Sequence, residues 1–259
     1  MTSEMSLPRR PSVTAWLGLA RSLLMYYAIP GRAAGWRRLY RQFVSPGDLC
    51  FDVGAHVGNR TAALLAIGAR VVAVEPQPLM ANTLRRLYGS NSRFTLVEKA
   101  VGGQAGEAEM LTSTSTPTVS TLSMEWTKQM KQTASFSNVR WDKKTKVEAA
   151  TLDELINGFG MPVFCKLDIE GFELDALKGL SHPIRTISFE YLPGAKDRSQ
   201  ACLDRLTELG DYQFTLIKGE YPRFAIQGWI SAGEMKNILM EIPLNWRAGE
   251  VYTRRRDGR

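Results

Sequence analysis

The stretch at residues 49–75 constrains the fold of this chain more than any other. An apolar run at 49–53 leads into two glycines four positions apart, Gly54 and Gly58. A helix-like run follows at 60–67, and residues 70–75 resemble a second buried strand that ends in a carboxylate. Strand, glycine turn, helix, strand and acid are typical of the nucleotide-binding half of a doubly wound sheet. Glycine lets the backbone approach a ligand closely, and the helix start offers free N–H groups.

The glycine spacing indicates which nucleotide the turn could hold. A dinucleotide-binding turn has the pattern Gly-x-Gly-x-x-Gly, which seats a pyrophosphate on the helix N-terminus. The turn here has no third glycine, and Asp52 lies just before it. A carboxylate at that place repels phosphate and attracts an ammonium group. S-adenosylmethionine carries a ribose, an ammonium and a sulfonium but no phosphate, and Glu75 could accept both ribose hydroxyls. The alternative is an ordinary strand–helix corner with a tight glycine turn.

Short buried strands and helices alternate along most of the remaining chain, which favours a parallel sheet with helices on both faces. The 259 residues, 44% of them hydrophobic, can bury one substantial core, so we expect a single α/β domain with appendages. Further strands are expected at 94–97, 163–168, 185–191, 212–218 and 223–230, and helices at 79–88, 152–157, 174–180, 201–209 and 234–240.

Residues 112–146 interrupt this alternation. The segment opens with a run of threonines and serines and then interleaves aromatic residues with lysines and an arginine. Its length suits a lid or a substrate-selecting loop. The alternative is a β-excursion whose lysines face only water.

An apolar stretch at 13–29 precedes the sheet. Arg21 interrupts it, it lacks a small-residue cleavage signature, and it is short for a bilayer span. Its apolar residues follow helical spacing, so we expect a helix that packs on the domain, over a sheet edge or the mouth of the cofactor site. Contact with a membrane surface is the alternative, because arginines flank the apolar face.

The charge and the cysteine content indicate little about the function of the chain. The formal net charge is +7, but much of the excess lies near the two ends of the chain, so it selects no partner. The three cysteines are odd in number and have no paired spacing, which favours a reducing cytoplasm. The sequence has no zinc-binding signature.

A second cluster of acids follows the buried run at 163–165. Asp168 and Glu170 stand two positions apart, so on a strand end their side chains would share a direction. Carboxylates at the carboxyl edge of a parallel sheet lie where such sheets bind ligands, and crowding there favours a raised pKa. The alternative is that Asp168 caps the next helix while Glu170 and Glu173 complement its dipole.

Four motifs in order carry a family resemblance: Phe-Asp-Val-Gly-Ala-His-Val-Gly-Asn at 51–59, Glu75-Pro76, Thr-Leu-Asp-Glu-Leu at 151–155, and Lys-Leu-Asp-Ile-Glu-Gly-Phe-Glu at 166–173. Over roughly residues 49–192 the chain resembles the FkbM family of S-adenosylmethionine-dependent methyltransferases. The resemblance implies a Rossmann-like class I methyltransferase fold, doubly wound around a mostly parallel sheet. The expected organisation is an N-terminal helical extension at 1–45, the methyltransferase domain at 46–253 and a basic tail at 254–259.

The resemblance also implies a role for each matching position. Gly54 and its neighbours would hold the methionine portion of the cofactor, Glu75 the ribose hydroxyls, and residues 98–101 would border the adenine. Asp168 would lie by the cofactor's amino acid or the substrate, with Glu170 close to the reacting group. The expected cofactor-binding residues are Asp52, Gly54, Ala55, His56, Gly58, Asn59, Glu75, Pro76, Glu98, Ala100, Val101 and Asp168. The expected catalytic residues are Asp168, Glu170 and Glu190, and no metal ligand is assigned.

The implied reaction moves a methyl group from S-adenosylmethionine to a hydroxyl oxygen of a small molecule, sugar or glycan. An alcohol loses its proton in that reaction, so we expect Asp168 or Glu170 to act as a base, with His56 as a rival. A metal-assisted version would use Asp168, Glu170 and Glu190 as oxygen ligands.

Two other function classes stay open. A nucleic-acid methyltransferase would suit the basic balance, but an Asp-Ile-Glu-Gly block stands where base-methylating enzymes carry an Asn/Asp-Pro-Pro-aromatic motif, and its acids would repel phosphates. A non-catalytic S-adenosylmethionine-binding protein would be favoured if the acids formed structural ion pairs. The expected acceptor is thus a small molecule, sugar or lipid-linked glycan rather than a nucleic acid. The arginine-flanked N-terminal helix tilts this towards a lipid-linked acceptor.

Overall fold

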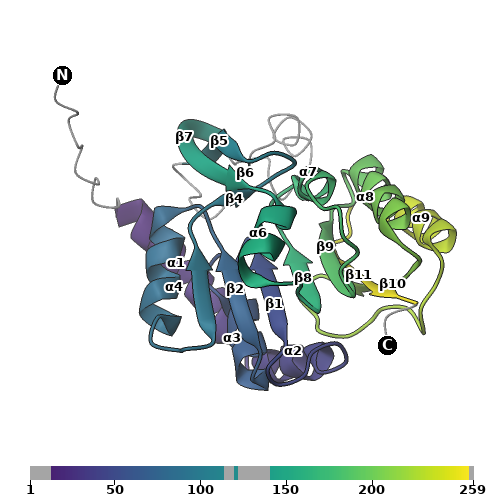
Figure 1. Cartoon of the computed structure of the whole chain (residues 1–259), viewed down its shortest axis with the longest axis horizontal. Helices are drawn as coiled ribbons and strands as arrows, with labels where there is room; N and C mark the ends of the chain where they lie inside the picture. The colour runs from purple at the N-terminus through teal and green to yellow at the C-terminus, as the bar shows by residue number, and fades with distance from the viewer. Residues whose placement is uncertain (1–12, 114–119, 122–140, 257–259) are drawn as a thin grey trace.

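A computed structural model describes residues 13–113, 120–121 and 141–256 (Figure 1). Its centre is a seven-stranded sheet with the strand order β10-β11-β9-β8-β1-β2-β3. Only β11 runs antiparallel to its neighbours, and the adjacent strands from β9 to β3 are parallel. The strands are β1 (Leu49–Val53), β2 (Arg70–Val74), β3 (Phe94–Val97), β8 (Phe164–Leu167), β9 (Thr186–Tyr191), β10 (Tyr212–Lys218) and β11 (Gly249–Arg255).

Helices cover both faces of this sheet, as expected for a doubly wound fold (Figure 1). One face packs against α2 (Arg32–Tyr40), α3 (Asn59–Ile67) and α4 (Pro78–Tyr88), and the other against α6 (Leu152–Phe159), α7 (Glu173–Lys178), α8 (Lys196–Leu209) and α9 (Ala232–Glu241). Because both faces are covered, all five residues of β1 are buried, which explains the continuous apolar runs in the sequence.

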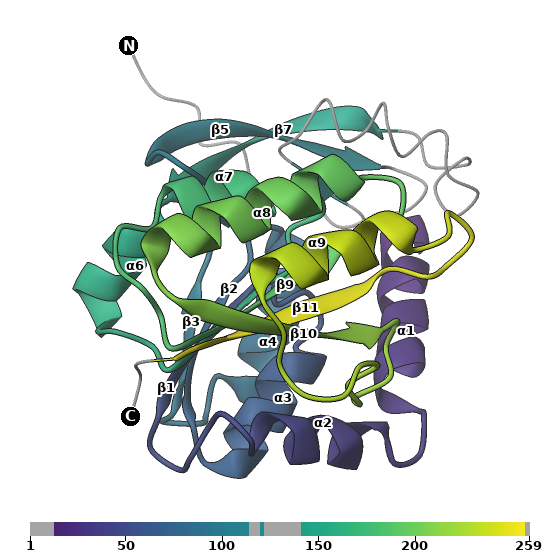
Figure 2. The same ribbon diagram turned by 90° about the vertical axis from the view of Figure 1, so that its right-hand side faces the viewer.

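A second, smaller sheet lies beyond the carboxyl end of β3 (Figure 2). Its strand order is β4 (Ala100–Val101), β7 (Trp141–Ala150), β5 (Gly106–Ser113) and β6 (Ser120–Thr121). The described ends of the predicted insertion therefore belong to β-strands that start before residue 112 and end after residue 146. Residues 114–119 and 122–140 lie outside the described residues, so the predicted lid role is not tested.

Three differences from the sequence-based expectations concern the edges of the fold. Residues 223–230 form no strand; they make only isolated bridges, such as Phe214 with Ile230. The helix α2 and the strand β11 were not expected. β11 was obscured by its charged residues, because Glu250 is buried in a polar network inside the molecule. Since β11 continues to Arg255, the first two residues assigned to a basic tail belong to the sheet.

The N-terminal extension contains α1 (Val13–Tyr27) and α2. Leu19 of α1 packs against Val57 in the glycine turn and Met80 of α4. The predicted packing of this helix on the domain is thus confirmed, and its place is over the glycine turn. Among the described residues, no helix combines the length and apolarity needed to cross a bilayer.

Candidate active site

The glycine turn joins the carboxyl end of β1 to α3. Gly54 and Gly58 both adopt left-handed backbone conformations, with φ of 76° and 79°. The N–H groups of Gly54 and Ala55 both donate to the carbonyl of Val74 at the end of β2. His56 also has positive φ, at 50°, which is uncommon for a residue other than glycine. The turn is therefore a fixed structure that the neighbouring strand holds in place.

Glu75 lies directly beside this turn and is only 3% exposed. One carboxylate oxygen accepts the N–H of His56 at 2.9 Å, and the other accepts the N–H of Gln77 at 2.9 Å. Burial raises the pKa of Glu75 to about 7, although these two hydrogen bonds oppose the rise. The backbone thus fixes the orientation of this carboxylate from both sides.

Asp52 lies beneath the glycine turn, whereas the sequence suggested a place beside the cofactor. Its side chain is fully buried, and one oxygen accepts the hydroxyl of Thr61 in α3 at 2.6 Å. The other oxygen has no hydrogen-bond partner among the described residues. In the sheet, Asp52 stands beside Lys166 of β8. Asp52 therefore forms part of the floor beneath the turn.

A second loop, after β8, meets the glycine turn. A Cβ atom at Gly54 would lie 1.8 Å from the carbonyl oxygen of Asp168, so only glycine fits between the two loops. The N–H of Asp168 in turn donates to the carbonyl of Val53. The structure thereby brings the two predicted acid-bearing loops together at the carboxyl edge of the sheet.

The loop after β8 differs in form from the predicted strand end. β8 ends at Leu167, and Glu170 has a left-handed conformation with φ of 55°. Glu173 holds this loop, because its carboxylate accepts the N–H groups of Ile169 and Gly171 at 3.0 and 3.2 Å. Asp168 and Glu170 therefore lie in a braced turn, and the expected strand alternation between them is wrong. Asp168 does not cap α7, whose N-cap is Phe172.

Lys166 is the cation that balances this acidic region. It is 2% exposed, and its Nζ lies 2.8 Å from a carboxylate oxygen of Asp168. Burial alone would raise the pKa of Asp168, but the charge and hydrogen bond of Lys166 outweigh it and lower that pKa. Burial and the neighbouring carboxylates raise the pKa of Glu170 to about 8. Near neutral pH, Asp168 is therefore ionised, whereas Glu170 mostly holds its proton.

Glu190 completes the acidic cluster from β9. Burial, followed by the charges of Asp168 and Glu170, raises its pKa well above the usual range. One of its carboxyl oxygens is buried without a hydrogen-bond partner among the described residues. Across the sheet it pairs in register with Glu250 of β11. The three acids predicted to be catalytic therefore lie close enough to interact electrostatically.

Arg60 provides a second buried cation that the sequence analysis did not single out. Its guanidinium lies 3.0 Å from the ring centre of Trp36 and pairs with Glu250 at 2.5 Å and with Glu220 at 3.0 Å. The residue is 3% exposed. This network connects the first turn of α3 to β11, so it fixes the helix that follows the glycine turn.

The helix α1 covers the glycine turn through two tyrosines. The ring of Tyr26 makes an edge contact with His56 at 5.9 Å between centroids. The hydroxyl of Tyr27 donates to the carbonyl of Val57 at 2.9 Å and lies 2.6 Å from the hydroxyl of Tyr88. Burial lowers the pKa of His56 to about 4, which makes its imidazole a weak base. Neither tyrosine has a sequence signature that would mark it.

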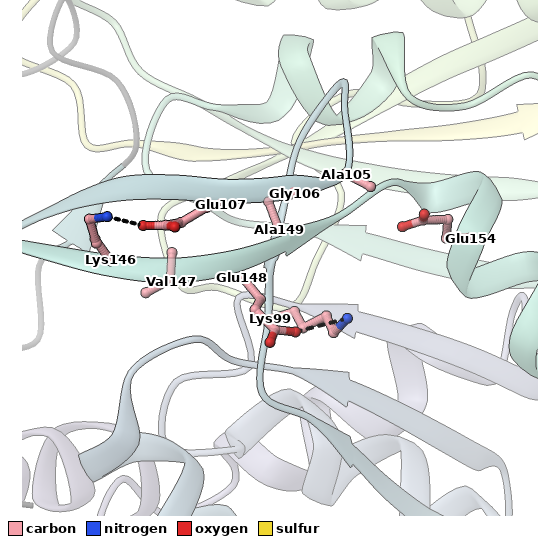
Figure 3. A pocket seen from close by; sticks show the side chains of 9 residues that line it. All are labelled: Lys99, Ala105, Gly106, Glu107, Lys146, Val147, Glu148, Ala149 and Glu154. Atoms are coloured by element: carbon pink, nitrogen blue, oxygen red, sulfur yellow. Dashed lines mark ion pairs between the residues drawn. The ribbon is translucent and has the colours of Figure 1, made fainter. Parts of the chain in front are cut away.

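The remaining expected cofactor-binding residues, including those expected to border the adenine, are less closely grouped. Pro76 is half-buried after Glu75, while Glu98 is exposed and pairs with Arg85. Ala100 and Val101 are buried in β4. Asn59 is the first residue of α3. Lys99 lines an open hollow of about 560 Å³ between β4, β5 and β7, shown in Figure 3. Within it Lys99 pairs with Glu148 and Lys146 with Glu107, and none of its lining residues belongs to the acid cluster.

The residues around the glycine turn fit S-adenosylmethionine. Each oxygen of Glu75 accepts one N–H and retains a further lone pair, so the carboxylate can accept two hydroxyls of a diol. The N-cap of α3, Gly58, makes no side-chain capping bond, which leaves the first N–H groups of that helix for a carboxylate. The acids beneath and beside the turn suit the positive charges of the cofactor. Among the described residues, no group of three or more His, Cys, Asp or Glu side chains is arranged to hold a metal ion.

Comparison with known proteins identifies the family. Residues 52–216 match the family described as the Methyltransferase FkbM domain, which spans more than half of the chain. No curated protein matches the chain significantly.

Several solved structures are similar at low identity. A precorrin-6y C5,15-methyltransferase from Geobacter metallireducens is 12% identical, with a TM-score of 0.45 and 86% of each chain covered. A SAM-dependent O-methyltransferase from Thermotoga maritima is 12% identical, with a TM-score of 0.43, 96% of this chain and 73% of that chain covered. A TehB-like SAM-dependent methyltransferase from Corynebacterium glutamicum is 12% identical, with a TM-score of 0.44, 93% of this chain and 96% of that chain covered. At these values the likenesses carry no information on the acceptor.

The motif order, the sheet with its glycine turn and Glu75, and the family match all agree. The chain belongs to the FkbM family and is an S-adenosylmethionine-dependent methyltransferase with a Rossmann-like fold.

Proposed function

We propose that this methyltransferase moves the methyl group to a hydroxyl oxygen of a small molecule, sugar or glycan. The observation that carries the proposal is the cluster of Asp168, Glu170 and Glu190, whose loop after β8 meets the glycine turn through the backbone of Asp168. An alcohol must lose a proton as it accepts a methyl group, and a carboxyl group can take that proton. A polyhydroxylated acceptor would also find hydrogen-bond partners in this cluster.

In this scheme the cofactor supplies an electrophilic methyl group on a sulfonium, and the protein aligns the acceptor and removes its proton. Glu170 is the base we favour, because a pKa of about 8 lies close to the working pH of most enzymes, so that a fraction of the enzyme carries the ionised carboxylate and this carboxylate is a stronger base than an ordinary glutamate. Asp168 is less basic, because Lys166 holds its charge. The raised pKa of Glu190 favours its protonated form, which can donate a hydrogen bond to the acceptor. The low pKa of His56 argues against the imidazole as the base.

The acidic surroundings also bear on the alternatives. A nucleic-acid methyltransferase would have to place phosphates near Asp168 and Glu170, where the charge is unfavourable. We therefore propose a small-molecule, sugar or lipid-linked glycan acceptor. Three buried, free cysteines suit a cytoplasmic protein, which is the location we propose.

The test is a transfer assay that measures S-adenosylhomocysteine release with a panel of sugars, glycans and hydroxylated small molecules. We expect turnover with at least one hydroxyl acceptor and loss of about a hundredfold in Glu170→Gln. Glu208→Gln, an exposed acid on α8, is the matched control and should keep full activity. Release that requires RNA, or unchanged turnover in Glu170→Gln, would contradict the proposal.

A further inference from the structure

The helix α1 has two faces of different kinds, and only one of them is used within the described structure. Leu19 and Ser22 are buried, and Tyr26 is half-buried above the glycine turn. These positions are three and four residues apart, so they lie on one side of the helix. The opposite side points away from the domain.

This outer face is apolar where a water-exposed helix is normally polar. Its crest is formed by Leu17 and Leu24, which are 65% and 67% exposed, with the exposed residue Ala20 between them. Trp16 and Met25 flank it and are 44% and 45% exposed. A surface helix whose outer face is mainly apolar usually has a partner for that face.

The helix α8 shows the contrast within the same molecule. It also buries one side, through Cys202, Leu203 and Leu206. Its exposed side, however, carries charged residues such as Asp204 and Glu208. The apolar outer face of α1 is therefore not a general feature of the surface helices of this fold.

The charge of this N-terminal segment indicates the kind of partner. Residues 13–47 contain five arginines and no aspartate or glutamate. Arg21 lies on the outer face beside Leu17 and Leu24, and the exposed residues Arg38 and Arg41 follow at the end of α2. Arg32 joins the two helices, because its guanidinium donates to the carbonyl of Met25 at 2.8 Å. Figure 2 shows α1 and α2 meeting at one corner of the molecule.

We propose that the outer face of α1 docks on an anionic phospholipid bilayer. Leucine and tryptophan side chains beside arginines are the composition of a helix that lies in the plane of the membrane interface. The 15 residues of α1 suit such a helix, because a bilayer span needs roughly 20 apolar residues. Because the inner face of α1 covers the glycine turn, docking places the active site next to the lipid. The docking itself does not depend on the nature of the methyl acceptor.

The test is co-sedimentation of the full chain with vesicles of phosphatidylcholine alone, or of phosphatidylcholine and phosphatidylglycerol in equal amounts. We expect the chain to sediment with the anionic vesicles, less so at high salt, since salt screens the arginines. Leu17→Ser with Leu24→Ser should weaken sedimentation about tenfold or more. Arg38→Glu with Arg41→Glu should weaken it only for the anionic vesicles.

The matched control is Leu87→Ser with Leu244→Ser, which changes two leucines that are 48% and 75% exposed elsewhere. It should sediment like the unmodified chain. Titration with S-adenosylhomocysteine checks that each variant is folded, and its failure would concern the cofactor site rather than the docking face. No sedimentation of the unmodified chain, or equal losses in the control, would overturn the proposal. So would a dimer in analytical ultracentrifugation that Leu17→Ser with Leu24→Ser dissociates, because the face would then pair two copies of this chain.

Discussion

The two loops that meet at Gly54 hold their carboxylates in different ways. The first loop is the glycine turn after β1, and the carboxylate beside it, Glu75 at the end of β2, is fixed by the backbone, with one N–H on each oxygen. After β8, in the second loop, several acids lie around the buried cation Lys166. The first arrangement fixes geometry, as recognition of an invariant cofactor requires. The second sets protonation states, as proton transfer requires.

The two loops nevertheless share a backbone feature. Each contains one residue other than glycine with positive φ, His56 in the first and Glu170 in the second. Such conformations cost free energy and persist only where the surroundings determine them. The hydrogen bonds from His56 to Glu75 and from the Glu170 loop to Glu173 provide those surroundings.

The largest expected effect comes from separating the two loops with Gly54→Ala. The new Cβ would lie 1.8 Å from the carbonyl of Asp168, and φ of 76° is unfavourable for alanine. We expect a loss of about 4 kcal/mol in the free energy of unfolding and no detectable binding of S-adenosylhomocysteine. Chemical denaturation and calorimetry measure the two effects.

Gly228→Ala is the control for that change. Gly228 has φ of 77° but no atom within 4 Å of the new Cβ. Only the backbone penalty of about 1 kcal/mol should appear there. Equal losses in the two variants would mean that the contact between the loops contributes nothing.

Removing the cation of the second loop should have the next largest effect. Lys166→Met leaves Asp168 and the neighbouring Asp52 without their buried counter-charge. We expect a loss of about 3 kcal/mol in the free energy of unfolding. Adding Asp168→Asn should restore part of the loss, because it removes the charge left alone. If the double variant were as unstable as the sum of the single variants, the ion pair would not be the cause.

The raised pKa of Glu75 predicts that cofactor binding depends on pH. Glu75 has a pKa of about 7 and must be ionised to accept two hydroxyls. The dissociation constant of S-adenosylhomocysteine should stay constant above pH 7 and rise about tenfold per unit below it. His56, with a pKa of about 4, contributes nothing in the neutral range. Calorimetric titration at several pH values measures this, and a flat profile for the unmodified chain would contradict it.

The raised pKa of Glu170 predicts a smaller effect, a pH dependence of stability. The pKa of Glu170 is about 8 in the folded chain against an ordinary value of 4.5, so the folded state holds this proton more tightly. Its contribution to stability is complete below pH 4.5 and is lost as the pH rises through 8. Between pH 4.5 and 8 the free energy of unfolding should therefore fall by about 1 kcal/mol less in Glu170→Gln than in the unmodified chain. This figure allows for solvent screening, because Glu170 is only half-buried. Thermal unfolding in a pH series would show it, and parallel curves would contradict it.

The fold and the main acids were predictable because their signals are local. The buried runs at 49–53 and 70–75 and the glycines between them specify a strand, a turn and a strand, and the acid cluster follows from one motif at 166–173. β11 was missed because its charged residues are buried by partners far away, such as Arg60 for Glu250. The contacts of Tyr26 and Tyr27 with the glycine turn depend on how α1 packs, which no spacing within the helix reveals. Lys166 could have been predicted, because a lysine inside an apolar strand needs a buried counter-charge.

The central claim is that the first loop binds S-adenosylmethionine through Glu75. The most direct test is calorimetric titration with S-adenosylhomocysteine of the unmodified chain and of Glu75→Ala, with Glu208→Gln as the matched control. We expect about micromolar affinity for the unmodified chain and the control, and an affinity about a hundredfold or more weaker for Glu75→Ala. No binding by the unmodified chain, or equal binding by Glu75→Ala, would contradict it.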